Sequence, residues 1–469
     1  MSALAIHGTA SFVGKSLLTT ALARSFARRG VRVAPFKAQN MSNNARVVGG
    51  GEIGVAQYLQ ARAAGIEPEL RMNPVLVKPE ADTRSQVVIN GRADLAVSRL
   101  PWRERAPFLA PAIEAALRSL LAEFELVLIE GAGSPAEINL RDIDLANLRV
   151  AELADAAVVL VADIDRGGAF AHLYGTWSLL GRKERERIGG FVLNKFRGDA
   201  SLLAPAPARL EQLTGVPLLG VVPWIEHGLP DEDGAAEQLR RGDRPVVSVI
   251  RYPTASNLDE FRALEQVADV VWVRRPGELR FADFIVLPGS KHVAGDLDWL
   301  LGSGFEEALL ARLGAGSRVL GICGGLQMLG MELIDEAGVD GSRTGLGLLQ
   351  ITTTFSAEKI ARESEARFAE ELPAPWDCLR GIAASGYEIR HGSSGVSGRV
   401  LEVLPEGLGF ASGSVLGLYL HGLFECPPVV AALFGAAPAR SLEATFDELA
   451  DVIDCALERQ LLHRLAGLR

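Results

Sequence analysis

Short apolar runs recur along the whole chain, and a polar or glycine-rich turn follows each of them. In the first half the runs occupy residues 3–7, 31–36, 126–130, 156–170, 189–196 and 217–223. In the second half they occupy residues 246–252, 269–273, 283–290, 318–325, 351–355, 387–392 and 415–424. Buried strands that alternate with helical segments are typical of a parallel sheet with helices on both faces. The pattern predicts an α/β protein with two doubly wound domains, each with its site at the carboxyl edge of its sheet.

A break in this pattern divides the chain. Residues 228–245 are charged, contain Gly and Pro and lack an apolar period, which is typical of a linker. We expect a first domain over residues 1–230, a linker over 231–245 and a second domain over 246–440, since 469 residues suit two domains. Residues 441–469 have the apolar spacing of a surface helix, and we expect that helix to pack on the second domain.

The composition restricts the kinds of partner and compartment. Hydrophobic residues make up 48% of the chain and charged residues 23%, and the net charge of −10 argues against a nucleic-acid surface. The four cysteines lack Cys-x-x-Cys spacing, so we expect neither a disulfide framework nor a tightly bound metal or redox cofactor. With no basic leader and no apolar stretch of about 18 residues, we expect a cytoplasmic protein without a membrane span. These features leave open whether the chain forms a homo-oligomer.

A glycine-bounded loop, residues 8–16, joins the first predicted strand to a helix. Backbone N–H groups of such a loop surround phosphates, while Lys15 neutralises phosphate charge and the Ser16 hydroxyl can ligate Mg²⁺. The usual pattern has its first glycine where this chain has Thr9, because Gly8 comes one position earlier. A simple helix-capping turn is the alternative, but the flanking strand and helix favour a phosphate loop. The residues predicted to bind ATP are Gly8, Thr9, Gly14, Lys15, Ser16 and, at a later strand end, Asn194.

Polar side chains gather at the predicted ligand edge of the first sheet. Glu130 ends a buried strand beside glycines and can hold Mg²⁺ together with Ser16, directly or through water. Residues 37–68 begin with a dense group of amide side chains, and residues 72–92 are polar and predicted to be irregular. Both features favour a role in binding over a solvated connection. The residues expected to face the substrate are Lys37, Gln39, Asn40, Asn139, Asp163 and Asp165.

A second candidate centre lies at Cys323, at a sharp turn between an apolar strand and a helix. A thiolate near a helix N-terminus is stabilised by backbone N–H groups, and this is the setting of a nucleophilic cysteine. His421 also follows an apolar run and precedes a glycine, so it is the best candidate for the base. An isolated cysteine is more often a buried structural residue. Here the spaced combination favours catalysis.

The Gly-x-Cys-Gly-Gly turn at Cys323, the nearby Gln327, the Leu-Pro-Gly-Ser turn at 287–290 and a strand-end histidine together resemble the class I glutamine amidotransferase domain. The resemblance implies a cysteine that releases ammonia from glutamine, and it implies a glutamine-binding and oxyanion site at Gly289, Gly324 and Gln327. Many class I relatives have a glutamate two residues after the histidine, where this chain has Leu423. Since Glu425 is a weak substitute, we expect a Cys323/His421 dyad.

A wider set of motifs resembles the cobyric acid synthase family over residues 3 to about 425. The motifs are GTASFVGKS at 8–16, AQNMS at 38–42, MNPVLVKPEADTRSQVV at 72–88, GAGSPAEINLRD at 131–142, FVLNKFRGD at 191–199 and GICGGLQMLG at 321–330. The loop at 8–16 is also similar to the dethiobiotin synthetase-like branch of P-loop enzymes, which activate carboxylates with ATP.

This resemblance implies an ATP- and glutamine-dependent carbon–nitrogen ligase of cobalamin biosynthesis. Its substrate would be a small-molecule corrin, adenosylcobyrinic acid a,c-diamide, amidated at the b, d, e and g carboxylates to give cobyric acid. ATP, Mg²⁺ and glutamine would be required, with no nucleic-acid or membrane partner. One alternative is a relative that amidates another carboxylate, such as a cobyrinic acid a,c-diamide synthase-like enzyme or one acting on a cell-wall precursor. The other is a P-loop ATPase switch of the ParA/MinD type, which would leave Cys323 and His421 without a role.

Overall fold

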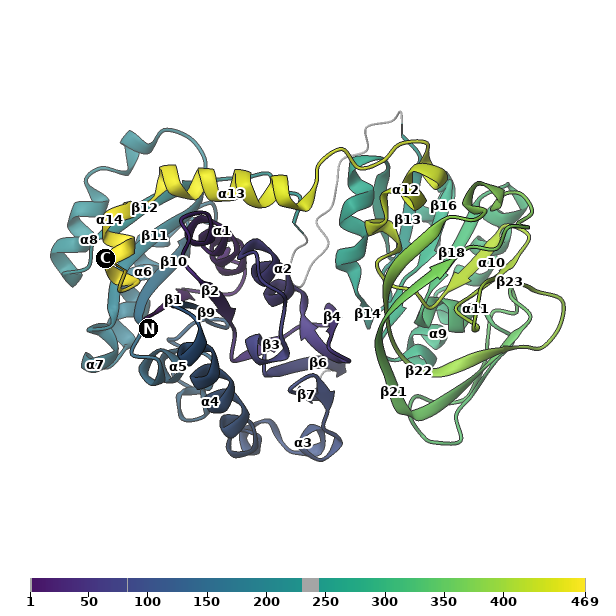
Figure 1. Cartoon of the computed structure of the whole chain (residues 1–469), viewed down its shortest axis with the longest axis horizontal. Coiled ribbons are helices and arrows are strands. Elements are labelled where there is room, and N and C mark those ends of the chain that lie inside the picture. Colours follow the sequence, from purple (N-terminus) through teal and green to yellow (C-terminus); the bar gives the residue numbers. More distant parts are fainter. Residues whose placement is uncertain (1, 82, 230–243, 469) are drawn as a thin grey trace.

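The computed structural model describes residues 2–81, 83–229 and 244–468, which form two α/β domains side by side (Figure 1). In these residues the first domain has a six-stranded sheet of order β12-β11-β10-β1-β9-β2, and the second has a seven-stranded sheet of order β15-β13-β16-β18-β25-β24-β23. The expectation of two doubly wound α/β domains is confirmed. The predicted linker, 231–245, falls almost entirely outside the described residues. No helix in the described ranges is long and apolar enough to cross a membrane.

The six predicted strands of the first domain are present, and all of them run parallel. They are β1 (Ser2–Gly8), β2 (Val33–Phe36), β9 (Leu126–Glu130), β10 (Ala157–Asp163), β11 (Ile188–Phe196) and β12 (Leu218–Pro223). Their side chains are largely buried because helices cover both faces of the sheet. The main covering helices are α1 (Lys15–Arg28), α2 (Val55–Ala63), α4 (Ala106–Glu123), α5 (Leu148–Leu153), α6 (Ala169–Leu179) and α8 (Ala206–Thr214).

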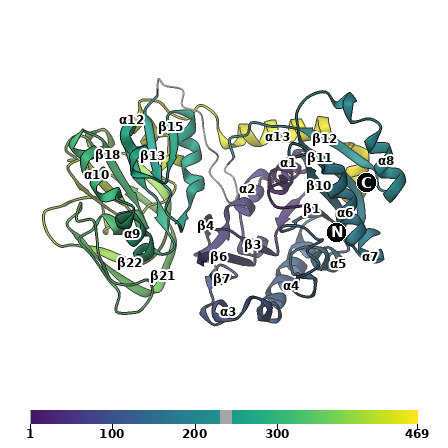
Figure 2. The ribbon, with the colours of Figure 1, turned by 180° about the vertical axis from the view of Figure 1, so that it is seen from behind.

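The polar region at 72–92 is not irregular, so that prediction is wrong. It forms an antiparallel pair, in which Val75, Leu76 and Val77 lie opposite Ile89, Val88 and Val87. The strands of this small sheet are β3 (Gln39–Met41), β6 (Val75–Ala81), β7 (Arg84–Ile89) and β8 (Arg92–Ala93), and a separate hairpin joins β4 (Ala45–Val48) to β5 (Gly51–Gly54). Both units project from the first domain toward the second (Figures 1 and 2).

The second sheet is parallel at its centre and antiparallel at one edge. Its strands are β13 (Val246–Ile250), β15 (Asp269–Val273), β16 (Phe284–Leu287), β18 (Arg318–Ile322), β25 (Val415–Leu418), β24 (Gly409–Ser412) and β23 (Leu401–Leu404). The runs at 351–355 and 387–392 are parts of a long antiparallel pair, β21 (Ile351–Arg367) and β22 (Ala383–Val396), on the side that faces the first domain (Figure 1). The main helices are α9 (Val293–Gly302), α10 (Phe305–Gly314), α11 (Gly324–Leu329) and α12 (Pro427–Phe434).

The C-terminal segment packs on the first domain, so its predicted place on the second domain is wrong. It forms two helices, α13 (Leu442–Ala456) and α14 (Arg459–Leu465), and α13 lies against α1 (Figures 1 and 2). Phe446 and Ile453 of α13 are buried in the same core as Leu22 and Phe26 of α1. An amphipathic helix needs an apolar surface to cover, and α1 provides one.

Charge also favours this site for α13. Two arginines of α1 and the C-cap residue Arg29 pair with acidic residues of α13. The pairs are Arg24 Nε–Asp447 Oδ1 at 2.8 Å, Arg28 Nη1–Asp451 Oδ1 at 2.7 Å and Arg29 Nη2–Asp454 Oδ2 at 2.8 Å. Pairs of this kind near the surface stabilise a protein only slightly, by about 0–1 kcal/mol each. They fix the register of α13, while the buried apolar side chains supply most of its stabilisation.

We expect Phe446→Ala to destabilise the first domain by about 3–5 kcal/mol, because it leaves a cavity beneath α13. Hydrogen exchange should become faster for amides of α1 and β1 and stay unchanged for amides of β16 and β18. Leu442→Ala is the matched control, since Leu442 is 37% exposed. Faster exchange in the second domain alone would contradict the observed packing.

Candidate active sites

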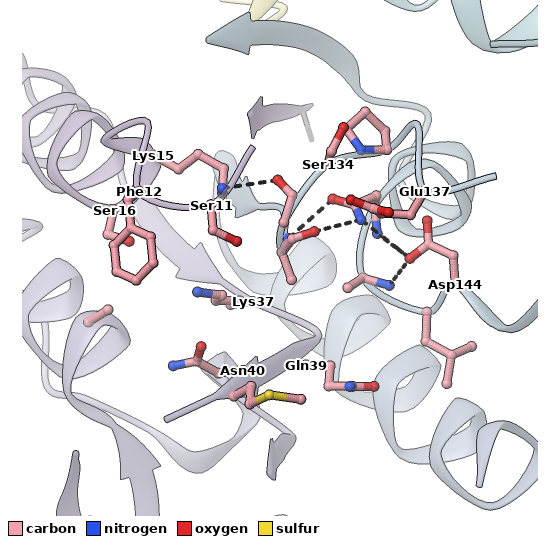
Figure 3. A pocket seen from close by; sticks show the side chains of 18 of the residues that line it. Ser11, Phe12, Lys15, Ser16, Lys37, Gln39, Asn40, Ser134, Glu137 and Asp144 are labelled. Atoms are coloured by element: carbon pink, nitrogen blue, oxygen red, sulfur yellow. Dashed lines mark hydrogen bonds between the residues drawn. The ribbon is translucent and has the colours of Figure 1, made fainter. Parts of the chain in front are cut away.

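A cavity of about 570 Å³ lies at the carboxyl end of the first sheet (Figure 3). Such a volume suits a nucleotide-sized ligand. Six of the predicted residues line it, namely Gly14, Lys15, Ser16, Lys37, Gln39 and Asn40. Lining residues that the sequence did not single out include Trp102, Arg105, Glu137, Asp144, Asn147 and Lys195. Glu137, Asp144 and Asn147 follow β9 within a few residues of the motif at 131–142, which is the signal that could have identified them.

The phosphate loop is shaped by its glycines. Gly14 has φ 93° and caps α1, and a Cβ there would lie 2.1 Å from Asn194 Nδ2. Asn194 donates through Nδ2 to Val13 O at 2.8 Å, so this residue supports the loop from beneath and is not among the residues that line the cavity. Lys15 Nζ donates to Ala10 O at 3.0 Å and to Gly133 O at 3.1 Å. Its ammonium therefore lies across the loop, where phosphates would bind.

The two other predicted loop residues lie behind the cavity. Thr9 N donates to Val161 O at 2.9 Å, which ties the start of the loop to β10. Gly8 has no room for a side chain, because a Cβ would lie 2.6 Å from Val13 Cγ2 and 2.9 Å from Lys15 Nζ. Neither Gly8 nor Thr9 is among the residues that line the cavity. Both shape the loop from its sheet side.

Glu130 is fully buried at the floor of this site. Its Oε1 accepts from Ser16 Oγ at 2.8 Å and from Lys37 Nζ at 2.8 Å, and its Oε2 accepts from Gln60 Nε2 at 2.5 Å. A hydroxyl beside one carboxylate fits a Mg²⁺ ion that keeps several waters and binds nucleotide phosphates. Among the described residues no group of three or more His, Cys, Asp or Glu could hold a metal, so the donors do not form an all-protein cage.

Three residues predicted to face the substrate do not line the cavity. Asp163 lies 3.0 Å from Lys195 in an ion pair, and Asp165 lies 3.5 Å from Arg197. Asn139 is exposed, and its backbone carbonyl oxygen accepts a hydrogen bond from Arg103 Nη2 at 2.8 Å. These side chains share the predicted edge of the sheet, but ion pairs hold the two aspartates outside the cavity.

The second site centres on Cys323, between β18 and α11. Cys323 is 5% exposed and has φ 51° and ψ −106°, a strained conformation for a residue with a side chain. The turn is closely packed, because a Cβ on Gly325 would lie 1.9 Å from Leu287 O. The Cys323 Sγ lies 3.3 Å from Ile389 O of β22. This geometry presents the sulfur at the carboxyl edge of the second sheet, as expected for a nucleophile.

A glutamate completes this site, so the predicted Cys/His dyad is wrong. His421 Nδ1 lies 3.0 Å from Glu260 Oε1, and Glu260 Oε2 accepts from Gly422 N at 2.9 Å. The Cys323 side chain also interacts with the imidazole and helps to raise the pKa of His421. Glu425, the weak substitute, pairs with Arg46 instead. The arrangement is a Cys–His–Glu triad in which Glu260 orients the imidazole.

Glu260 lies in a part of the chain for which the sequence predicted no site residue. It belongs to the 3-10 helix η5 (Leu258–Gln266), which lies between β13 and β15. Glu260 comes 161 residues before His421 in the sequence. The sequence offers Glu425 as the only carboxylate shortly after His421, and Glu425 is not the residue that contacts the imidazole. The signal that could have identified it is the buried acidic pair Asp259 and Glu260 directly after a strand end.

The triad holds His421 as an imidazolium. Burial would lower the pKa of His421, but the Glu260 carboxylate and the hydrogen bond with Cys323 outweigh it and raise the pKa from 6.5 to about 10. The imidazole is 1% exposed, which strengthens its interaction with the buried carboxylate.

The predicted oxyanion residues lie around Cys323. A Cβ on Gly289 would lie 3.0 Å from His421 Cε1, and one on Gly324 would lie 2.8 Å from Ser290 N. The Gly289 backbone therefore approaches His421 closely, and the Gly324 backbone, directly after Cys323, packs against Ser290. Gln327 is buried, and its Nε2 donates to His391 O at 3.1 Å, so its amide is used to attach α11 to β22.

Glu260→Gln should lower the kcat of glutamine hydrolysis by about 10- to 100-fold, since the imidazole loses the charge that orients it. The pKa of His421 should fall in this variant. On the alkaline side of the profile, activity should therefore decline at a lower pH than in the unmodified protein. The raised pKa also stabilises the fold fully below pH 6.5, and this contribution disappears as the pH rises through about 10. Rate–pH profiles test this, with Glu306→Gln as the surface control. An unchanged profile would exclude Glu260 from the triad.

The two domains match two known domain families. Residues 246–429 match the CobB/CobQ-like glutamine amidotransferase domain, and residues 4–232 match the CobQ/CobB/MinD/ParA nucleotide binding domain. Together with the triad and the phosphate loop, these matches define a glutamine amidotransferase fused to a nucleotide-binding domain.

Relatives of the same length identify the family. The cobyric acid synthase of Polaromonas sp. (strain JS666) is 53% identical over 98% of this chain and 97% of its own length. That of Variovorax paradoxus (strain S110) is 54% identical, with 98% of each chain covered. That of Polaromonas naphthalenivorans (strain CJ2) is 53% identical, again with 98% of each covered. The chain belongs to the cobyric acid synthase family.

Proposed function

We propose that this protein is a glutamine-hydrolysing carbon–nitrogen ligase that amidates corrin side chains in cobalamin biosynthesis. The substrate is adenosylcobyrinic acid a,c-diamide, and the carboxylates at b, d, e and g become amides to give cobyric acid. The observation that carries this proposal is the presence of both centres, the Cys–His–Glu triad and the phosphate-loop cavity, in one chain of this family.

The triad releases ammonia. The Cys323 thiolate attacks the glutamine carboxamide. N–H groups of Gly289 and Gly324 donate hydrogen bonds to the oxygen on which negative charge develops, and each stabilises it by about 3 kcal/mol. The His421 imidazolium protonates the departing nitrogen, and a glutamyl thioester remains on the sulfur. His421 then removes a proton from the water that hydrolyses the thioester and frees glutamate. Glu260 holds the imidazole in place through both steps.

The first domain makes the acid reactive. A free carboxylate does not react with ammonia in water, so it is first phosphorylated by ATP, and ammonia then displaces phosphate. Lys15 and the loop N–H groups bind the phosphates, and Ser16 and Glu130 are placed to hold Mg²⁺. When bound, Mg²⁺ neutralises charge on the transferred phosphoryl group. Lys37 lines the same cavity and faces Glu130, where it can bind the substrate carboxylate.

Ammonia has to travel between the two centres unprotonated, because ammonium is not a nucleophile. The domains meet through buried side chains, such as Leu76 and Val88 of the first domain and Tyr387 and Ile389 of the second. This buried apolar cluster supports a route sheltered from bulk water. The ratio of glutamate formed to amide formed measures how much ammonia escapes from this route.

Product analysis tests the proposal. The protein is incubated with a corrin a,c-diamide, ATP and Mg²⁺, with either glutamine or ammonium, and amides, glutamate and ADP are measured. We expect amidation with both nitrogen sources and close to one glutamate per amide. ATP hydrolysis at a rate that does not depend on glutamine or corrin would favour a ParA/MinD-type switch. No amidation of the a,c-diamide, with amidation of cobyrinic acid or of a cell-wall precursor offered in its place, would favour a different substrate.

A further inference from the structure

One short segment of the first domain reaches both centres. At its start, Lys37, Gln39 and Asn40 line the nucleotide cavity. At its end it touches η5 of the second domain, which carries Glu260. Asn44 Oδ1 accepts from Leu258 N at 3.1 Å, and Ala45 O accepts from Asn257 Nδ2 at 3.1 Å. The segment 37–46 is therefore a direct physical link between the two active sites.

Arg46, the last residue of this segment, is buried between the domains with 6% of its surface exposed. Its guanidinium pairs with Asp259 at 2.5 Å and with Glu425. Its Cζ also lies 5.1 Å from the ring centroid of Tyr387 and 5.8 Å from that of Tyr58. A buried guanidinium between two carboxylates and two rings has little freedom to move.

Of the three groups that Arg46 contacts in the second domain, Asp259 and Tyr387 adjoin the triad. Asp259 directly precedes Glu260 in η5. The Tyr387 ring stacks on the His421 imidazole, with centroids 5.3 Å apart and planes 18° apart. The backbones of Tyr387 and His421 also exchange two hydrogen bonds, of 3.1 and 2.8 Å. Arg46 thus contacts the neighbours of both Glu260 and His421, without contacting the place where glutamine reacts.

We propose that Arg46 is a positioning residue for glutamine hydrolysis, supplied by the nucleotide-binding domain to hold Glu260 and His421 in line with Cys323. This inference rests on the proposed function. It makes the ammonia-producing centre dependent on a side chain of the domain that consumes ammonia. Its physical basis is charge, because removing Arg46 leaves the fully buried Asp259 without its cation. Burial raises the pKa of Asp259 to about 6 even with Arg46 opposing it, so the carboxyl would then protonate or move, and η5 with it.

Three variants test this role in the full-length protein: Arg46→Met, Arg46→Lys and, as a matched control, Arg118→Met on the exposed face of α4. Glutamate release with glutamine alone gives the kcat, KM and pH profile of hydrolysis. Amide formation from ammonium, ATP and corrin reports on the first domain. For Arg46→Met we expect kcat for hydrolysis to fall about 10- to 100-fold, since small displacements of catalytic groups cost this much. KM for glutamine should change less, the alkaline limb of the profile should move to lower pH, and ammonium-dependent amidation should persist.

Arg46→Lys should recover part of kcat, and Arg118→Met should match the unmodified protein. A double variant, Arg46→Met with Asp259→Asn, removes both buried charges and separates positioning from folding. We expect it to restore thermal stability but not glutamine hydrolysis. Unchanged kcat and pH profile in Arg46→Met, or recovery of hydrolysis in the double variant, would overturn the inference. Failure of corrin amidation in the unmodified protein would instead overturn the proposed function, since glutamate release is measured separately.

Discussion

Replacing Cys323 with alanine should abolish glutamine-dependent amidation and leave ammonium-dependent amidation near its original rate. The sulfur is the only atom of the triad that forms a bond with the glutamine carbon, so its loss should lower hydrolysis at least about 10³-fold. The first domain keeps its phosphate loop and its cavity, and external ammonia needs no thioester. Glutamate release and amide formation, measured with each nitrogen source, give both rates.

Cys455→Ala is the matched control, because Cys455 is an exposed free cysteine on α13. It should leave both reactions unchanged. Glutamine-dependent amidation that survived in Cys323→Ala would exclude the triad as the source of ammonia. Loss of the ammonium reaction as well would point to a structural role for the turn at Cys323.

Replacing Lys15 with alanine should abolish amidation from both nitrogen sources, by about 10²–10³-fold, because no other step can activate the carboxylate. The Lys15 ammonium bridges Ala10 O and Gly133 O across the loop, so its removal takes charge from the place where phosphates bind. Glutamine hydrolysis measured alone should continue, since the triad lies in the other domain.

Amide formation from ammonium is the decisive measurement for Lys15→Ala, together with ADP release. Lys183→Ala, on the exposed surface of helix α7 (Arg182–Arg185), serves as the control. Amide formation at the original rate in Lys15→Ala would place carboxylate activation elsewhere than the phosphate loop.

The parallel sheets could be predicted because their strands are buried on both faces and read as uninterrupted apolar runs, as in 126–130. The sequence predicted only short parts of β21 and β22. Many side chains of these strands are exposed and polar, so most of their length shows no apolar pattern. The site of α13 was not predictable from its own residues. Its apolar face shows that the helix packs on something, but the complementary arginines lie on α1, more than 400 residues earlier.

The site residues also differ in how well the sequence could locate them. Gly14, Lys15, Ser16 and Cys323 belong to turns whose chemistry is local, so adjacent residues were enough to predict their positions. Asp163 and Asp165 were placed at the correct edge of the sheet, but the sequence does not specify the side chain's direction or its ion-pair partner. Glu260 was missed because triads are assembled through space from separate elements. No spacing rule links it to His421.

The return of α13 to the first domain means that the second domain is attached at both of its ends. One attachment is the chain that leaves the first domain after Leu229, and the other is the stretch between α12 and α13. Two tethers keep the facing surfaces at a high effective concentration, so even a weak contact between them stays mostly formed. The two domains are thus confined by two connections, and moving them fully apart would require the docking of α13 on α1 to break.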